Sequence, residues 1–284
     1  MNKRELYYLL SPKLRRIFRR LYYYPSDLLD NILGRRDKLI PPKGKIFIGH
    51  GDFKIQGDRL LNQLISYANL QPDQRVLDVG CGIGRLAVPL TKYLNHKGSY
   101  EGFDIVKSGI KWCKKNISNS YPNFNFKHID LKNDLYNLST DKEAKNFIFP
   151  YNDNEFDLVF LFSVFTHMTP LDVDNYLKQI NRVLKHNGTC FVTFFILNEE
   201  SKSLMDNYNG LKFNYNMGDY VLLDKKVREA NVAYKEDFLN HLIFNNNFII
   251  DKIFYGWWCG RKREKCLDYQ DTIILRKVAN RKFN

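Results

Sequence analysis

Residues 76–85, which read VLDVGCGIGR, decide the fold. The first four are typical of a buried strand, and glycines then occupy positions 80, 82 and 84. Glycine permits a tight turn and lets a ligand approach the backbone, and the free amides of a following helix can bind a carboxylate or a phosphate. The stretch therefore predicts a strand, a ligand-binding loop and a helix.

Outward from this stretch, strand and helix patterns alternate along most of the chain. We expect strands at 75–79, 99–104, 124–129, 156–162, 188–196, 248–255 and 271–277, and helices at 59–70, 84–94, 106–117, 170–185 and 235–246. Apolar strands that alternate with helices predict a doubly wound α/β fold with a mostly parallel sheet. The polar segment 198–232 interrupts the pattern, and we expect a lid or insertion there with a hairpin turn at residues 217–219.

Positive charge is concentrated at the two ends of the chain. The formal net charge is +13; residues 1–45 carry +8 and residues 252–284 carry +6, which leaves residues 46–251 at −1. We therefore divide the chain into a basic extension, residues 1–45, and one main domain, residues 46–284.

Within the extension, residues 3–23 have the spacing of a basic amphipathic helix, and we expect it to be broken at Pro12 and closed at Pro25. Two interpretations are open for this helix. It contacts a membrane surface or another anionic partner, or it packs over the domain with its arginines in water.

The chain carries no pattern of a secreted or membrane-spanning protein. No window approaches the roughly 20 apolar residues of a spanning helix, and the first residues lack the apolar region of a signal peptide. Five cysteines without a CxxC pair argue against a disulfide framework or a zinc site, so we expect no metal. The expected location is cytoplasmic, or peripheral to a membrane if the extension binds one.

The glycine loop alone does not identify its ligand. Residues 82–87, GIGRLA, match the GxGxxA form of the dinucleotide-binding fingerprint, so NAD is one candidate. Asp78, two residues before the first glycine, argues against it, because a carboxylate there would lie near a pyrophosphate. The choice of cofactor depends on the residues that flank the loop.

The run VLDVGCGIG resembles motif I of the class I S-adenosylmethionine-dependent methyltransferases, a family with a Rossmann-like, mostly parallel seven-stranded sheet. The resemblance implies that Asp78 orients the methionine ammonium of S-adenosylmethionine. It also implies that Asp104, in EGFDIV, binds the ribose hydroxyls, and that Asp130, in KHID, faces the adenine amino group beside Leu131. The segments FDLVFLFSVFTHM (156–168) and RVLKHNGTCFVTFF (182–195) are similar to further motifs of the family.

The same resemblance implies additional cofactor contacts along the chain. These are Gly80, Cys81, Gly82, Gly84, Ile105, Ser163 and Phe53, the last as part of a GHGDF segment (49–53) that folds over the methionine end. An aspartate at a strand end often only caps the next helix. Three such acids behind one glycine loop favour a cofactor site.

Candidate residues for the acceptor side are fewer. A general base is expected near the end of the fourth or fifth strand, where His167 is the first candidate and His50 the second. Either histidine has an alternative role as a cofactor contact or a helix cap. Trp257, Trp258 and Arg261 suit an aromatic or sugar acceptor, although tryptophan more often packs in a core.

The combination of motifs resembles bacterial methyltransferases of small molecules and glycans. No Asn-Pro-Pro-Tyr-type motif, typical of nitrogen methylation in this superfamily, follows the fourth strand; FSVF stands there instead. The sequence therefore predicts O-methylation of a small molecule or a glycan. RNA methylation, an NAD-dependent oxidoreductase and a non-catalytic binding protein are the alternatives, and a nucleic-acid partner is the less favoured one because the central region is neutral.

Overall fold

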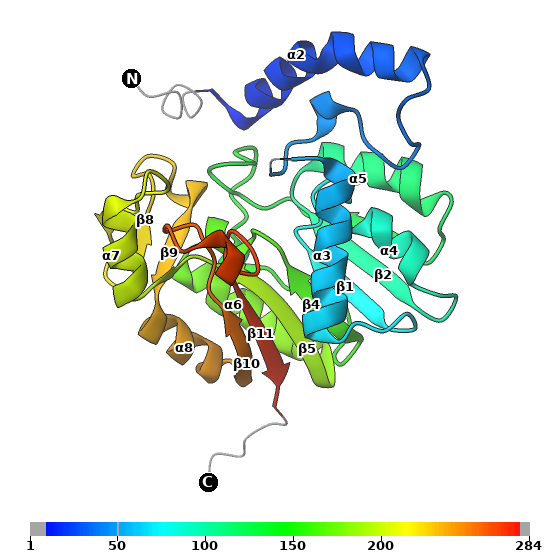
Figure 1. Ribbon diagram of the computed structural model, residues 1–284. Coiled ribbons are helices and arrows are strands. Elements are labelled where there is room, and N and C mark those ends of the chain that lie inside the picture. The colour runs from blue at the N-terminus through cyan, green and yellow to red at the C-terminus, as the bar shows by residue number, and fades with distance from the viewer. Residues whose placement is uncertain (1–9, 50, 279–284) are drawn as a thin grey trace.

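The structure is a computed structural model that describes residues 10–49 and 51–278. Its centre is a seven-stranded sheet in the order β10-β11-β5-β4-β1-β2-β3 (Figure 1). The strands are β1 Arg75–Val79, β2 Ser99–Asp104, β3 Phe124–His128, β4 Phe156–Leu161, β5 Leu184–Phe194, β10 Phe248–Phe254 and β11 Asp271–Lys277. Strands β1 to β5 pair in parallel, and β11 is antiparallel to both of its neighbours. The predicted α/β class and mostly parallel sheet are confirmed.

Helices cover both faces of this sheet. They are α3 Phe53–Ala68, α4 Ala87–Tyr93 and α5 Lys107–Cys113 on one face, and α6 Pro170–Val183 and α8 Glu236–Asn245 on the other. Successive residues of β4 belong to opposite cores: Val159 packs with α6 and α8, and Leu158 packs with α3 to α5. Strands buried on both faces explain why the sequence shows continuous apolar runs instead of alternation.

The order of the strands reverses between β1 and β4. Strands β1, β2 and β3 extend the sheet in one direction, and β4 and β5 extend it in the other. Ligands of doubly wound sheets bind outside the carboxyl ends of the strands at such a switch point. The glycine loop, which follows β1, lies at this point.

The segment 198–232 contributes to a second, smaller sheet. This sheet has the order β6-β9-β8-β7, formed by β6 Ile196–Leu197, β7 Tyr215–Asn216, β8 Tyr220–Leu222 and β9 Val232–Lys235. It packs with α7 Glu199–Asn207 around a third core that includes Phe195, Met205 and Trp258. Strands β7 and β8 pair antiparallel across residues 217–219, so the predicted hairpin turn is confirmed.

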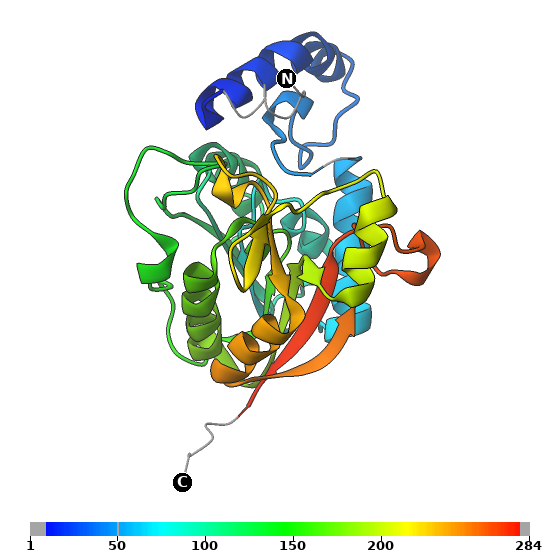
Figure 2. The same ribbon diagram turned by 90° about the vertical axis from the view of Figure 1, so that its left-hand side faces the viewer.

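The N-terminal helix differs from its prediction. Helix α2 spans Pro12–Ile32 and lies outside the layers of the domain (Figures 1 and 2). Pro12 begins the helix instead of breaking it, because the first turn needs no amide donor and Ser11 caps it. Pro25 lies inside the helix, so the expected end there was wrong. No helix within residues 10–49 and 51–278 has the length and hydropathy that crossing a membrane requires.

Candidate active site

A cavity of about 1070 Å³ opens at the carboxyl ends of the parallel strands. Its wall includes residues 78–81 at the end of β1, residues 103–106 at the end of β2, residues 131–133 after β3 and residues 162–164 after β4. Residues 47–49, several residues between 257 and 270, and side chains that include Tyr136, His167 and Glu229 also line it. The cavity therefore lies at the switch point of the sheet, where a cofactor of this fold is expected.

The backbone of the glycine loop requires glycine at each of its three positions. Gly80, Gly82 and Gly84 have φ values of +77°, +61° and +79°, in the left-handed region that other residues adopt only with strain. A Cβ atom on Gly80 would lie 2.4 Å from Val164 Cγ2, and one on Gly84 would lie 2.9 Å from Ile117 Cδ1. Gly80 and Cys81 are among the described residues that line the cavity, whereas Gly82 and Gly84 shape the loop from outside that lining.

Asp104 fastens this loop to the end of β2. Its Oδ2 accepts a hydrogen bond from the Gly82 amide at 2.8 Å, and its Oδ1 accepts one from the Val106 amide at 2.6 Å. Burial raises the pKa of Asp104, and the two backbone donors oppose that shift. A carboxylate oxygen has more than one lone pair, so Asp104, which lines the cavity, retains acceptor capacity for a ligand hydroxyl.

Asp78 lines the cavity at the end of β1. Its Oδ2 accepts a hydrogen bond from the Tyr100 hydroxyl at 2.7 Å. Burial raises the pKa of Asp78 to about 7. A ligand cation beside this carboxylate would offset the cost of burying its charge, as the predicted role toward an ammonium group requires.

The third predicted acid does not reach the cavity wall. Asp130 is exposed, and its Oδ1 accepts a hydrogen bond from Asn137 Nδ2 at 2.9 Å. The next residue, Leu131, is buried and lines the cavity together with Asn133. The structure therefore brings Leu131 into the cavity wall and leaves Asp130 outside its described lining, hydrogen-bonded within the loop after β3.

His167 lies in the cavity wall in a form suited to accept a proton. Its Nδ1 lies 2.9 Å from the backbone oxygen of Glu229. A carbonyl oxygen only accepts, so Nδ1 carries the proton and Nε2 holds a lone pair in the neutral ring. Burial lowers the pKa of His167, which favours this neutral form. The ring of Tyr136 packs edge-on against the imidazole at 5.6 Å between centroids.

Glu229 is a site residue that the sequence did not reveal. It lines the cavity from the segment 198–232, and its carboxylate accepts a hydrogen bond from the Asp134 amide at 2.6 Å. Burial raises the pKa of Glu229 to about 7. Because its partners lie 62 and 95 residues away in the chain, no local pattern could have identified it.

Three other predicted cofactor contacts have different surroundings. Ile105 and Ser163 line the cavity, and Ser163 adopts φ +58° in a turn where its Oγ donates to Gln270 Oε1 at 2.9 Å. Phe53 begins α3 and is buried beneath the Arg85 guanidinium, outside the described cavity lining. His50, the second candidate base, lies outside the described residues.

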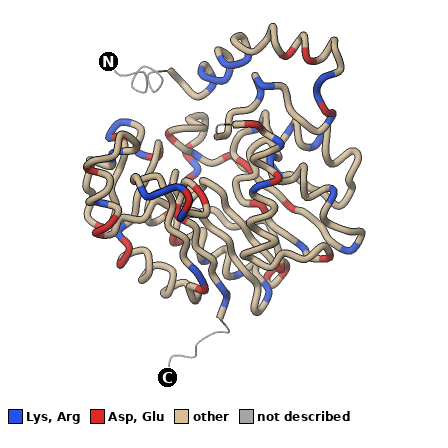
Figure 3. Tube along the Cα trace, in the orientation of Figure 1, with Lys and Arg blue, Asp and Glu red and all other residues tan. Residues whose placement is uncertain are grey.

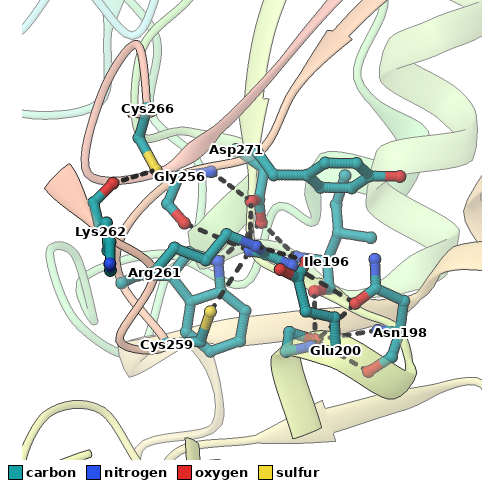
Figure 4. Close-up of polar contacts among 12 residues, drawn as sticks. Ile196, Asn198, Glu200, Gly256, Cys259, Arg261, Lys262, Cys266 and Asp271 are labelled. Carbon is teal, nitrogen blue, oxygen red and sulfur yellow. Dashed lines mark hydrogen bonds and ion pairs between the residues drawn. The ribbon is translucent and has the colours of Figure 1, made fainter. Parts of the chain in front are cut away.

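The three residues predicted to contact the acceptor lie in different surroundings in the structure. Trp257 lines the cavity. Trp258 is fully buried in the third core, and its Nε1 donates to Asp271 Oδ2 at 2.7 Å. Arg261 extends between Asp271 and Glu200, with its Nε 2.8 Å from Glu200 Oε2 (Figure 4).

The prediction for Trp258 and Arg261 is corrected, because neither is among the described residues that line the cavity. Both satisfy Asp271, a fully buried carboxylate at the start of β11. The same carboxylate accepts hydrogen bonds from the amides of Gly256 and Ile196. A charge at that depth requires such partners, so these side chains serve the stability of the small sheet.

The cavity contains polar side chains that the sequence did not single out. Arg59 forms an ion pair with Asp268 at 2.8 Å, which joins α3 to the segment before β11. Gln56, Arg263 and Gln270 also line the wall. Their positions in the chain are scattered, so only the fold brings them together.

The residues present fit the predicted S-adenosylmethionine. Asp104 offers acceptors for hydroxyls, Asp78 offers a buried carboxylate for a cation, and Ile105 and Leu131 offer apolar surface for a ring. Gly80 and Cys81 of the glycine loop form part of the adjoining wall. This donor set is that of an amino-acid-bearing nucleoside.

Comparisons with known proteins agree with this geometry. The model of the methyltransferase domain family matches residues 70–243, more than half of the chain. The ubiquinone/menaquinone biosynthesis C-methyltransferase of Wigglesworthia glossinidia brevipalpis is 26% identical over 197 residues, which are 67% of this chain and 73% of that relative. The sterol 24-C-methyltransferase of Schizosaccharomyces pombe is 26% identical over 155 residues, 54% of this chain but only 36% of that relative.

Solved structures share the fold. A protein from Pyrococcus horikoshii OT3 superposes with a TM-score of 0.55 at 16% identity, over 83% of this chain and 95% of that one. An S-adenosylmethionine-dependent methyltransferase from Clostridium acetobutylicum superposes with a TM-score of 0.52 at 15% identity, over 91% and 100% of the two chains. At these identities the likeness concerns the architecture alone.

Proposed function

Because the chain belongs to the methyltransferase domain family and takes S-adenosylmethionine as its cofactor, we propose that it methylates a hydroxyl group of a small, largely apolar acceptor. The family membership excludes the dinucleotide interpretation of GxGxxA. The observation that carries the proposal is the position of His167 in the cavity wall, with its Nδ1 2.9 Å from the backbone oxygen of Glu229.

The cofactor, when bound, supplies an electrophilic methyl group on a sulfonium. On the protein side, Asp78, Gly80, Cys81, Asp104 and Leu131 would hold it, since they line one end of the cavity. Transfer to an oxygen is a direct displacement, in which the protein gains rate by aligning the acceptor and removing its proton.

In this proposal His167 removes the acceptor proton at Nε2. The hydrogen bond from Nδ1 to the Glu229 carbonyl fixes the tautomer and the orientation of the ring. A second hydrogen bond, from Asn133 Nδ2 to the His167 carbonyl at 3.1 Å, holds the backbone at this position. Glu229 is therefore a positioning residue in this scheme.

The part of the cavity wall that does not contact the cofactor in this proposal favours an apolar acceptor more than a glycan. Its aromatic and aliphatic side chains include Phe162, Phe195, Leu211, Trp257 and Leu267, and they lie among the polar side chains described above. Such surfaces bind a ring or chain by excluding water, and the few polar groups fix its orientation. The names of three relatives mention quinones or a sterol, and these names are consistent with acceptors of this kind.

C-methylation is a second candidate. Two relatives are named C-methyltransferases, and a base that deprotonates a phenolic hydroxyl would also activate the neighbouring ring carbon. The absence of a nitrogen-methylation motif after β4 does not separate oxygen from carbon. The position of the new methyl group in the product distinguishes the two.

The test begins with calorimetry of the purified protein with S-adenosylhomocysteine. Labelled S-adenosylmethionine is then offered with a panel of phenols, alcohols, quinols and oligosaccharides, and the product is analysed by mass spectrometry and NMR. We expect binding and an O-methyl product from an apolar hydroxylic acceptor. A methyl group on carbon would favour the second candidate, and transfer only to oligosaccharides would overturn the apolar acceptor.

A further inference from the structure

Helix α2 presents its apolar face away from the protein. Its large apolar side chains are exposed over the whole length of the helix: Leu14, Ile17, Phe18, Leu21, Tyr22, Tyr24, Leu28, Leu29 and Ile32. Leu21 is 64% exposed, Tyr22 78% and Ile32 69%. Most of these positions follow the three- and four-residue spacing of one helical stripe. A contiguous apolar stripe of this length on a protein surface marks an interaction site.

The polar face of the same helix is turned toward the protein. Asp27 accepts hydrogen bonds from the amides of Lys43 at 2.7 Å and Gly44 at 2.9 Å, and Asp30 pairs with the Lys43 ammonium at 3.1 Å. Arg16 donates to the backbone oxygen of Tyr136 at 3.2 Å. This orientation is the reverse of a helix that packs on a hydrophobic core, so burial of apolar surface against residues 10–49 and 51–278 does not explain it.

The positive charge of residues 10–45 indicates which kind of partner fits the apolar face of α2. Residues 10–45 contain ten Lys and Arg against three Asp, a net charge of +7. Lys13, Arg20, Arg35 and Lys38 are exposed. Figure 3 shows basic segments in blue at both ends of α2. A second copy of the chain would bring two such segments together against their repulsion. An anionic lipid surface accepts both the apolar stripe and the cations.

Aromatic side chains on the exposed stripe fit the same occupant. Phe18, Tyr22 and Tyr24 are all more than half exposed. Aromatic rings with a polar edge favour the boundary between lipid chains and head groups. The helix has 21 residues, so it would lie along about 30 Å of that boundary.

The helix is also attached beside the mouth of the cavity. Tyr136, whose backbone Arg16 binds, lines the cavity. A Cβ atom on Gly44 would lie 3.0 Å from Arg20 Cα, so the chain after the helix packs directly against it. That chain continues into residues 47–49 of the cavity wall, and both views place α2 above this end of the domain (Figures 1 and 2).

We propose that α2 is a membrane-docking helix that lies in the plane of an anionic bilayer and holds the cavity mouth at its surface. The docking itself is independent of the reaction. Its consequence, that the acceptor is an apolar molecule dissolved in the bilayer, rests on the proposed function.

The experiment is co-sedimentation of the full chain with vesicles of phosphatidylcholine alone and of phosphatidylcholine mixed with phosphatidylglycerol. The test variant is Phe18→Gln/Leu21→Gln/Leu28→Gln. The matched control, Ile148→Gln/Leu171→Gln/Ile249→Gln, removes three exposed apolar side chains from other parts of the surface. Circular dichroism and thermal unfolding verify that each variant is folded.

We expect the wild-type chain and the control to bind the mixed vesicles, more weakly as salt is added, and the test variant to bind on the order of 100-fold more weakly. Equal binding by the test variant, or no binding by the wild type, overturns the proposal. A salt-resistant dimer that the test variant dissociates, without vesicle binding, shows that a second copy covers the face instead. Calorimetry with S-adenosylhomocysteine and methylation of a water-dispersed acceptor are measured without vesicles, so failure of the proposed function is recorded separately.

Discussion

Asp104 performs two tasks with one carboxylate. It holds Gly82 and Val106 by backbone hydrogen bonds, and it lines the cavity where the ribose of the cofactor is expected. Asp104→Ala removes about 1–3 kcal/mol of hydrogen bonding, so we predict that S-adenosylhomocysteine binds from several-fold to about 100-fold more weakly. Isothermal titration calorimetry measures the change.

Asp130→Ala is the matched control for this substitution. Asp130 also ends a strand region and was predicted to contact the cofactor, but it is exposed and pairs with Asn137. Its removal should leave the affinity unchanged within about twofold, well below the loss of a ligand hydrogen bond. If Asp130→Ala weakens binding and Asp104→Ala does not, the two assignments are reversed.

His167→Gln tests the proposed base. Glutamine retains a polar side chain but accepts no proton at neutral pH, so we predict that kcat falls by about 100-fold or more. Affinity for S-adenosylhomocysteine should change far less. Equal losses in kcat and in affinity would assign His167 to binding the cofactor.

The pH dependence of the same variant gives an independent readout. The base acts in its neutral form, and burial lowers the pKa of His167, so kcat/KM of the wild type should fall only below the ordinary histidine range near 6.5. The His167→Gln profile should lack this acid limb. A limb that persists in the variant belongs to another group.

At the residue scale, the sequence was sufficient to place those residues whose positions depend on local spacing. Gly80, Asp78 and Asp104 belong to one strand–loop unit and its neighbour, so their spacing was sufficient to place them. Trp258 and Glu229 depend on packing between distant segments. A tryptophan before the last strand gives the same local signal whether it lines a cavity or fills a core.

At the scale of elements, the small sheet is anchored to the main one through Asp271. This carboxylate joins β11 to the amides of Ile196 and Gly256 and to the indole of Trp258. Asp271→Ala leaves three buried donors unpaired, and we predict a loss of about 3–5 kcal/mol in the free energy of unfolding. Urea denaturation measures it.

Asp251→Ala provides the comparison. Asp251 pairs with Arg276 at 3.3 Å on the surface of the neighbouring strands, where an ion pair contributes less than about 1 kcal/mol. Similar stabilities for the two variants would show that the Asp271 network does not anchor the small sheet.

The elements themselves were predicted more accurately than their ends and contacts. Strand β5 begins at Leu184, four residues before its predicted start, because pairing with β4 continues past a left-handed turn at Asn187. Pro12 and Pro25 were interpreted as helix boundaries from their usual effect, but α2 accommodates both. Contacts with other segments of the fold determine where these elements begin and end, and a local sequence pattern carries no information about those contacts.

At the scale of the whole molecule, one cavity is closed by segments far apart in the sequence. Residues 47–49, the loops at the strand ends, Leu211 and Glu229 of the segment 198–232, and residues before β11 share its wall. The cofactor end is built from consecutive strand–loop units and was therefore predictable. The acceptor end of the cavity is formed by segments from distant parts of the chain. Its residues could therefore be identified only from the fold.

Buried carboxylates should also affect the stability of the whole chain. Burial raises the pKa values of Asp78, Glu229 and Asp271 to about 7, above their unfolded values near 4. The folded state then binds more protons than the unfolded state, so the free energy of unfolding should decrease as pH rises through about 7. Buried His167 has the opposite effect, but only below about pH 6.5, since its folded pKa is lowered. We predict a Tm that decreases from about pH 6.5 to 8, and a smaller decrease for Glu229→Gln, which cannot ionise. Thermal melts across this range decide the matter, because a Tm that rises with pH would mean that these carboxylates are already charged in the folded protein.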